Sequence, residues 1–419
     1  ESNTDSDTED QEQDTTDENT DQETNDSQDE SDEDTSGDDT TSDDENNDSS
    51  SSDDESNSEE TDNTDTEDNE TESNIDSEID ESLDLYHAVG FFHNGEFGTE
   101  FLNFGFDGQD KVVIESKESS SSAMLYSEAP CKIYQDGEMT IDEDKKGALS
   151  ADGNFFTLGA TGGQYPSTTL GIRQTSGLTA ADLEGDYRVF LIQATQDDSS
   201  TAEIQKGVIS ADGFDHLSAD QETGLDFESF YYVDEDTGHL SLEPEGAYSA
   251  MDGALSAQGR IFAAVDVDDS DGTLLFIIGI RISEDTRATD PSGDGYYVNQ
   301  FRYENEESPA GSFLELLIES DLSYDSYEID STAGAVLEDS SGTLSVDETG
   351  LIQGESDNDG DNLSGAVAPD GEVLVVQDES LLGVGIRQSS DSSDSSSTSD
   401  DGGGGGGSSA GCFIGTLSF

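Results

Sequence analysis

One ten-residue phrase occurs three times in the chain, at intervals of about a hundred residues. It reads GALSADGNFF at 147–156, GALSAQGRIF at 253–262 and GAVAPDGEVL at 365–374. In each copy a turn sequence, Asp-Gly or Gln-Gly, separates two short runs rich in apolar residues. Glycine supplies the positive φ that such a turn needs. The phrase therefore predicts the same β-hairpin in three equivalent units.

Other landmarks recur in the same order around this phrase. Each unit opens with an aromatic-rich run that contains a tyrosine and closes with Gly-Ile-Arg. About eight short apolar runs, bounded by turn residues, lie between these landmarks. Only residues 177–185 could form a turn of helix. The sequence therefore predicts an all-β protein with three tandem antiparallel meanders of about 100 residues, at 83–176, 177–285 and 286–389.

Eight consecutive antiparallel strands leave two open edges unless the sheet closes. Closing each unit gives three up-and-down eight-stranded barrels, whereas splitting each unit into two blades gives a six-bladed β-propeller. The opening tyrosines and the closing arginines favour the barrels. In a closed meander the first and last strands are neighbours, so the guanidinium can lie over the phenol ring. The structural pairs predicted in this way are Tyr86 with Arg173, Tyr187 with Arg281, and Tyr296 with Arg387.

Residues 185–187 (Gly-Asp-Tyr), taken with Arg281, resemble the signature of the lipocalin-like (calycin) barrels. In that family a Gly-x-aromatic sequence on the first strand meets a basic residue on the last. The third unit fits more loosely around Tyr296, and the first unit has no glycine at this place. DLEGDY at 182–187 also resembles the opening of tandem β-repeats in secreted bacterial proteins. These resemblances imply barrel modules that can hold small ligands, in an exported protein.

Two tails flank the repeats. Residues 1–80 contain 37 acidic residues and no Lys or Arg, a composition that cannot bury enough apolar surface to fold. We expect residues 1–82 to be a disordered, solvated spacer; the alternative is a polyanion that binds calcium or mineral diffusely. Residues 390–419 form a flexible Ser/Asp/Gly-rich tail ending in GCFIGTLSF. This ending resembles the Gly-rich Cys-Phe-Ile tails of some exported bacterial proteins, and the resemblance implies Cys412 as an attachment point; an unprocessed, disordered end is the alternative.

The charge restricts the partners. The chain has 103 acidic and 13 basic residues, a net charge of −90. Such a field repels nucleic acid and anionic membrane surfaces, and no apolar run is long enough to span a membrane. The charge suits a salty or divalent-rich medium, as for a marine or halophilic microbe. The first residue is Glu1 rather than methionine, which fits a removed leader. We expect an extracellular or cell-surface location, with partners in the cell envelope, in the extracellular matrix or among divalent cations.

Candidate chemistry is sparse. The four histidines share no spacing, which argues against zinc, and no nucleophile motif is present. Two aspartate clusters resemble calcium loops, although neither has the glycine that an EF-hand loop needs at its sixth position. A solvated turn is the default interpretation of both clusters, and weak calcium binding is the alternative. Their residues are Asp357, Asp359 and Asp361 in the first and Asp266, Asp268 and Asp271 in the second.

The sequence thus predicts a non-enzymatic exported or cell-surface repeat protein without a cofactor, except for weak calcium. Its role would be structural, adhesive or ligand-displaying. Two alternatives remain open. In one, the barrels bind small ligands or calcium; in the other, a β-propeller acts as a hydrolase.

Overall fold

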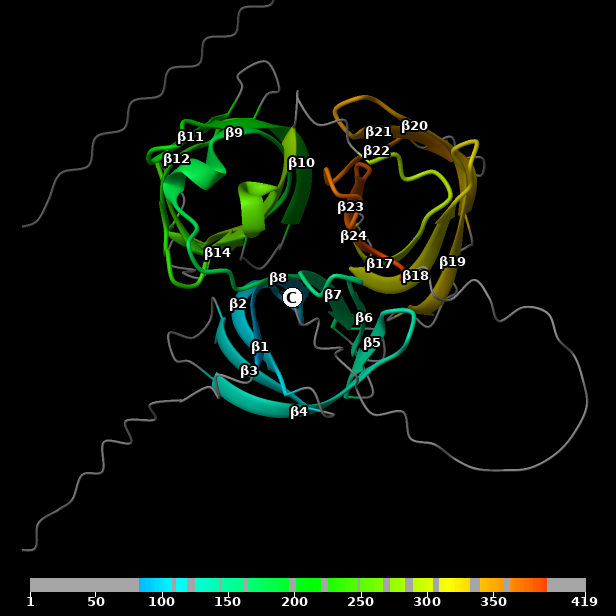
Figure 1. Cartoon of the computed structure of the whole chain (residues 1–419), viewed down its shortest axis with the longest axis horizontal. Coiled ribbons are helices and arrows are strands. Elements are labelled where there is room, and N and C mark those ends of the chain that lie inside the picture. Colours follow the sequence, from blue (N-terminus) through cyan, green and yellow to red (C-terminus); the bar gives the residue numbers. More distant parts are fainter. Residues whose placement is uncertain are drawn as a thin grey trace, which may run out of the picture. The chain divides into compact units, whose positions relative to one another are not determined.

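The computed structural model describes residues 83–389 apart from twelve short segments (Figure 1). Those segments are 108–110, 119–124, 143–144, 161–164, 196–200, 220–224, 247–248, 267–271, 283–288, 304–308, 332–339 and 357–361. The predicted N-terminal spacer and C-terminal tail, Cys412 included, lie outside the described residues.

The first eight strands form a closed antiparallel barrel, barrel 1, in which each strand pairs with the next and β8 returns to β1. Its strands are β1 (Asp84–His93), β2 (Phe97–Phe106), β3 (Lys111–Glu118), β4 (Leu125–Ile133), β5 (Glu138–Ile141), β6 (Lys145–Leu149), β7 (Phe155–Ala160) and β8 (Ser167–Arg173).

Barrel 2 closes in the same way, with β16 paired to β9. The short 3₁₀ helix η1 (Ala180–Leu183) precedes it, within the one stretch where the sequence predicts a helical turn, and η3 (Ala257–Gly259) lies in its repeated hairpin. Its strands are β9 (Gly185–Thr195), β10 (Thr201–Ala211), β11 (His216–Ala219), β12 (Glu228–Val233), β13 (His239–Pro244), β14 (Met251–Leu255), β15 (Ile261–Asp266) and β16 (Thr273–Ile282).

Barrel 3 closes through β24 and β17. Its strands are β17 (Gly295–Arg302), β18 (Ala310–Ile318), β19 (Ser323–Ser331), β20 (Ser340–Val346), β21 (Leu351–Ser356), β22 (Asn362–Val367), β23 (Val373–Gln377) and β24 (Leu381–Arg387). The prediction of three eight-stranded barrels is confirmed, and the six-bladed propeller was the wrong alternative.

Each barrel is closed by the residues that the repeats share. The first and last strands pair in register, so that Tyr86 lies opposite Arg173, Tyr187 opposite Arg281, and Tyr296 opposite Arg387. All three tyrosines are buried. In barrel 2 the guanidinium carbon of Arg281 lies 6.0 Å from the centre of the Tyr187 ring.

The three tyrosine hydroxyls explain why the ten-residue phrase is repeated. In each barrel this hydroxyl donates a hydrogen bond to the carbonyl of the glycine in the repeated turn. The pairs are Tyr86 with Gly153 at 2.5 Å, Tyr187 with Gly259 at 2.6 Å and Tyr296 with Gly371 at 3.0 Å. A buried carbonyl without a donor would be costly. The repeated turn therefore depends on the tyrosine of the first strand, which explains why both sequences recur in every repeat.

The arginines have a second set of partners. The Arg173 guanidinium forms an ion pair with Asp84, and that of Arg387 pairs with Asp294 at 2.8 Å. Both aspartates stand two residues before the opening tyrosine. Barrel 2 has Gly185 at this place, and there Arg281 donates instead to backbone carbonyls, among them that of Gln258 at 3.1 Å.

The glycine of Gly-Ile-Arg lies opposite the second residue of the strand that follows the repeated turn. Gly279 pairs with Phe262 across the last two strands of barrel 2, and a Cβ on Gly279 would overlap the Phe262 ring. Barrel 3 has Leu374 opposite Gly385, where a Cβ would lie no closer than 3.1 Å to another atom. The crowding thus follows the size of the facing side chain.

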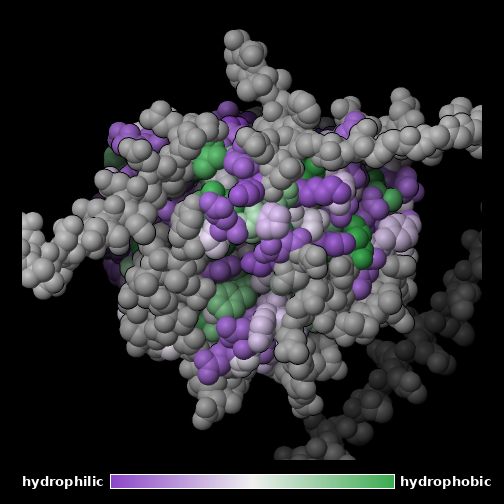
Figure 2. Space-filling view, turned by 90° about the horizontal axis from the view of Figure 1, so that it is seen from below, coloured by the Kyte–Doolittle hydropathy of each residue, from purple (hydrophilic) through white to green (hydrophobic). Residues whose placement is uncertain are grey.

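The barrels share a hydrophobic core in addition to their own interiors. Each interior is a separate cluster of buried residues, and a fourth cluster contains residues from all three barrels. Phe91 of β1 lies near its centre, with its ring 6.3 Å from that of Phe276 in β16 and 5.0 Å from that of Phe301 in β17. Among the coloured residues on the face in Figure 2, hydrophilic and hydrophobic ones are interspersed. The barrels therefore use part of their outer surfaces as core.

Candidate functional site

The tyrosines and arginines predicted to pair at the barrel ends stabilise the fold. Each tyrosine hydroxyl is bonded to a turn carbonyl, and burial raises the pKa of all three phenols above the ordinary value. A protonated phenol that donates to a backbone carbonyl holds a turn in place. This arrangement accounts for the tyrosines and arginines without a ligand.

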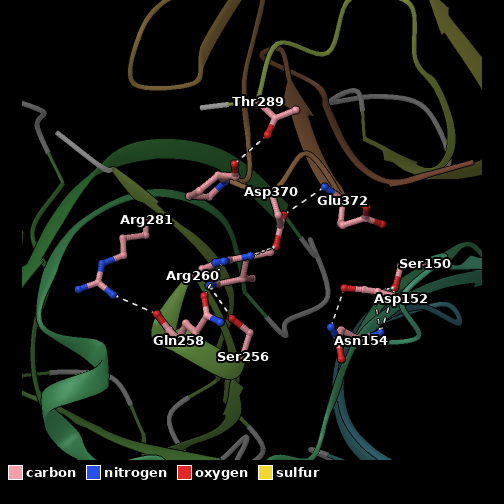
Figure 3. A network of polar contacts seen from close by, with 12 residues as sticks. Ser150, Asp152, Asn154, Ser256, Gln258, Arg260, Arg281, Thr289, Asp370 and Glu372 are labelled. Atoms are coloured by element: carbon pink, nitrogen blue, oxygen red, sulfur yellow. Dashed lines mark hydrogen bonds and ion pairs between the residues drawn. The ribbon is translucent and has the colours of Figure 1, made fainter. Parts of the chain in front are cut away.

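The repeated hairpins of the three barrels meet around a small cavity (Figure 3). Asn154, Gln258 and Asp370, one from each hairpin, contribute to its lining, and its volume is about 60 Å³. Arg260 crosses from barrel 2 to barrel 3 and binds the Asp370 carboxylate at 2.7 Å. The space suits a few water molecules rather than an organic ligand.

Two of the four histidines, His87 and His239, lie side by side at the contact between barrels 1 and 2, although the histidines share no spacing in the sequence. His87 is only 6% exposed, stacks on Phe101 and donates through Nδ1 to Asn103 Oδ1 at 2.8 Å. The His239 ring lies 5.5 Å from the His87 ring, and its Nε2 is 3.1 Å from Asp252 Oδ1. Burial lowers the pKa of His87 from its ordinary value to about 4.

Acid is therefore expected to destabilise the protein through His87. Between pH 6.5 and 4 the unfolded chain binds a proton at this ring and the folded one does not, so the free energy of unfolding falls as pH falls. The full loss is about 3 kcal/mol. Urea denaturation at several pH values measures it. His87→Phe should flatten this part of the profile, and Asn103→Asp should reduce the loss, because a carboxylate stabilises the charged ring. Identical profiles for all three proteins would contradict the prediction.

The calcium candidates fall mostly outside the described residues. This applies to Asp268, Asp271, Asp357, Asp359 and Asp361. Asp266 is described and is fully buried at the end of β15, where its backbone carbonyl accepts a hydrogen bond from the Thr99 hydroxyl of barrel 1. Calcium binding at these clusters stays a prediction.

A larger hollow lies between barrels 2 and 3. This inter-barrel cleft has a volume of about 410 Å³, within the range of small-molecule sites. It is formed by β9 and β10 on one side and β21 and β22 on the other. Its lining residues are Arg188, Val189, Phe190, Lys206, Gly207, Val208, Leu351, Gln353, Ser364 and Gly365.

Strand alternation places two cations in the cleft. Tyr187 and Val189 point into barrel 2, so Arg188 between them points outward. Lys206 lies opposite the outward Phe190 in the register of β9 and β10. Each cation reaches barrel 3, where Arg188 Nη2 donates to Thr349 Oγ1 at 2.6 Å and Lys206 Nζ to Ser364 Oγ at 2.8 Å.

One donor of the Arg188 side chain, its Nε–H group, makes no hydrogen bond with the described residues. The side chain is 16% exposed, and this Nε is buried. Burial lowers the pKa of Arg188, and the opposing effect of Asp347, with Oδ2 at 4.0 Å, is smaller. A buried donor without an acceptor is costly, and an anion can satisfy it.

The composition of the cleft is opposite to that of the chain. Acidic residues outnumber basic ones by 103 to 13 in the chain, yet the ten residues that line the cleft include two bases and no acid. Sequence reasoning missed this site because Arg188 and Lys206 occur on separate strands, and their partners lie in another repeat. The only signal was the rarity of cations, two of which fall on adjacent strands.

No protein-family model and no curated protein matches the chain. Among solved structures, transferrin binding protein B from serogroup B Neisseria meningitidis has a TM-score of 0.28 and 8% identity, over 70% of this chain and 64% of that one. The chain thus covers less than two thirds of that protein's length. A double mutant of the same antigen from Haemophilus parasuis has a TM-score of 0.28 and 10% identity, over 73% and 76%.

A Nostoc punctiforme protein of unknown function, from the DUF3598 family, has a TM-score of 0.18 and 12% identity, over 73% of this chain and 95% of that one. At these values the comparisons carry no argument about this chain. None of the helices in the described part of the chain has the length and hydropathy to cross a bilayer.

Proposed function

We propose that this is an exported, non-enzymatic binding protein whose inter-barrel cleft takes an organic carboxylate with an apolar body. The observation that carries the proposal is the acid-free cleft with Arg188 and Lys206 in a chain of net charge −90. The carboxylate would accept from Arg188 Nε and approach Lys206. The apolar body would lie against Phe190, Val208 and Leu351.

The rest of the fold supports binding rather than catalysis. The three barrels share a core of buried residues, which supports a preformed cleft between two of them. The field of the remaining surface repels free anions, so the cleft would select ligands with enough apolar surface to offset that repulsion. The acidic composition, which suits a salty medium, supports the proposed location outside the cell.

Octanoate and octanol distinguish this proposal from simple apolar binding. Isothermal titration at 0.5 M NaCl should show octanoate binding to the full chain and octanol binding at least tenfold more weakly, because only the carboxylate satisfies Arg188. Arg188→Gln and Lys206→Gln should each raise the dissociation constant of octanoate at least tenfold.

Lys132→Gln is the matched control, since it removes one positive charge from an exposed site on β4. It should change the dissociation constant less than twofold. Equal binding of octanoate and octanol, equal effects of all three substitutions, or no binding of octanoate would each overturn the proposal.

A further inference from the structure

Three potential metal ligands meet on the outer face of barrel 2, away from the cleft. They are His216 at the start of β11, Glu228 at the start of β12 and Glu245, one residue beyond β13. One ligand atom from each lies within 4.8 Å of the other two. The exposed face of three consecutive strands thus carries an imidazole and two carboxylates.

The register of the strands explains this meeting. Leu217 is buried inside the barrel, so His216 points outward. Glu228 is likewise outward, because its neighbour Ser229 is buried. The Glu245 backbone N–H donates to the Glu228 carbonyl at 2.7 Å and brings the two glutamates side by side. The pairing of β12 with β11 and with β13 therefore brings the three side chains to one face of the sheet.

The imidazole distinguishes this group from the acidic surface around it. The chain has only four histidines among 419 residues. The His216 ring packs edge-on against Phe230, with centroids 5.5 Å apart, and this contact restricts its rotation. Two carboxylates and a neutral imidazole balance the charge of one divalent ion.

We propose that His216, Glu228 and Glu245 bind one Zn²⁺ ion on the outer face of barrel 2. Three protein ligands with imidazole and carboxylate donors match zinc, which takes a water molecule in the fourth position. Calcium and magnesium prefer oxygen ligands alone, so the imidazole selects a transition metal over both.

Zinc titration in the presence of excess calcium tests the site in the full chain. Calcium at about 10 mM occupies the diffuse carboxylate sites, and isothermal titration with ZnCl₂ should then show one ion bound per chain. His216→Gln, Glu228→Gln and Glu245→Gln should each weaken zinc binding at least tenfold, because two ligands hold the ion much less firmly than three.

Glu243→Gln is the matched control. Glu243 is exposed on the same face of β13, two residues before Glu245, and lies opposite Phe230 in the register. The substitution removes the same charge and should leave zinc affinity within twofold. An equal loss in Glu243→Gln and Glu245→Gln, or zinc binding abolished by calcium, would show diffuse binding to a polyanion and overturn the proposal. Neither result affects the carboxylate cleft.

Discussion

Replacing Gly279 by alanine is expected to lower the free energy of unfolding by about 3 kcal/mol or more, as overpacking of a fixed core does. A methyl group at this position would overlap the Phe262 ring. That ring cannot move aside, because it is fully buried and packs against Tyr187 with centroids 5.1 Å apart. Urea denaturation followed by circular dichroism measures the loss.

The third barrel supplies the control for this substitution. Gly385→Ala occupies the equivalent place opposite Leu374, where the nearest atom, Val298 Cγ2, would be 3.1 Å away. We expect a change below about 1 kcal/mol there. Phe262→Leu combined with Gly279→Ala places alanine opposite leucine, as Gly385→Ala does in barrel 3, and should recover part of the loss, as a double-mutant cycle would show. Equal losses at Gly279 and Gly385 would contradict the explanation.

Truncation of Phe91 to alanine should have the second large effect. This fully buried ring contacts rings from barrels 2 and 3, and its removal should cost about 3–5 kcal/mol. The core that the barrels share should make the wild-type protein unfold in one calorimetric transition. Phe91→Ala should broaden or split that transition, because it weakens the coupling between the barrels.

Phe104→Ala serves as the control for coupling. Phe104 lies in the interior of barrel 1 and belongs to that barrel's own cluster. Its truncation should destabilise barrel 1 by a similar amount without removing a ring that contacts barrels 2 and 3. The explanation is wrong if scanning calorimetry shows three separate transitions in the wild type, or identical profiles for the two variants.

The architecture of one barrel was predictable from the sequence, because the repeated landmarks lie at the ends of the same closed sheet. Tyr187 and Arg281 are 94 residues apart in the chain and neighbours in the structure. The Asp-x-Tyr pattern at Asp84 and Asp294 was missed, although it recurs in two of the three repeats. The second repeat has Gly185 at this place.

The burial patterns of individual strands also reflect the core that the barrels share. In a strand with one face in water, buried and exposed residues alternate along the chain. β12 shows this alternation over its whole length. β15 and most of β16 are buried without alternation, which indicates that both faces are covered. The inter-barrel cleft could not be predicted in this way, since Arg188 and Ser364 come from different repeats whose relative placement no local pattern specifies.

The way the outer faces of β1, β16 and β17 cover one another bears on how such a chain can evolve. Copies of a self-sufficient module can be added or deleted freely during gene duplication. In this protein, a chain with two units would expose the apolar outer faces of its barrels to water. The apolar outer face of a fourth unit would have no other barrel to pack against. We therefore expect selection to keep the number of repeats at three. Recombination between the repeats would yield proteins with exposed apolar surface, which are prone to aggregate.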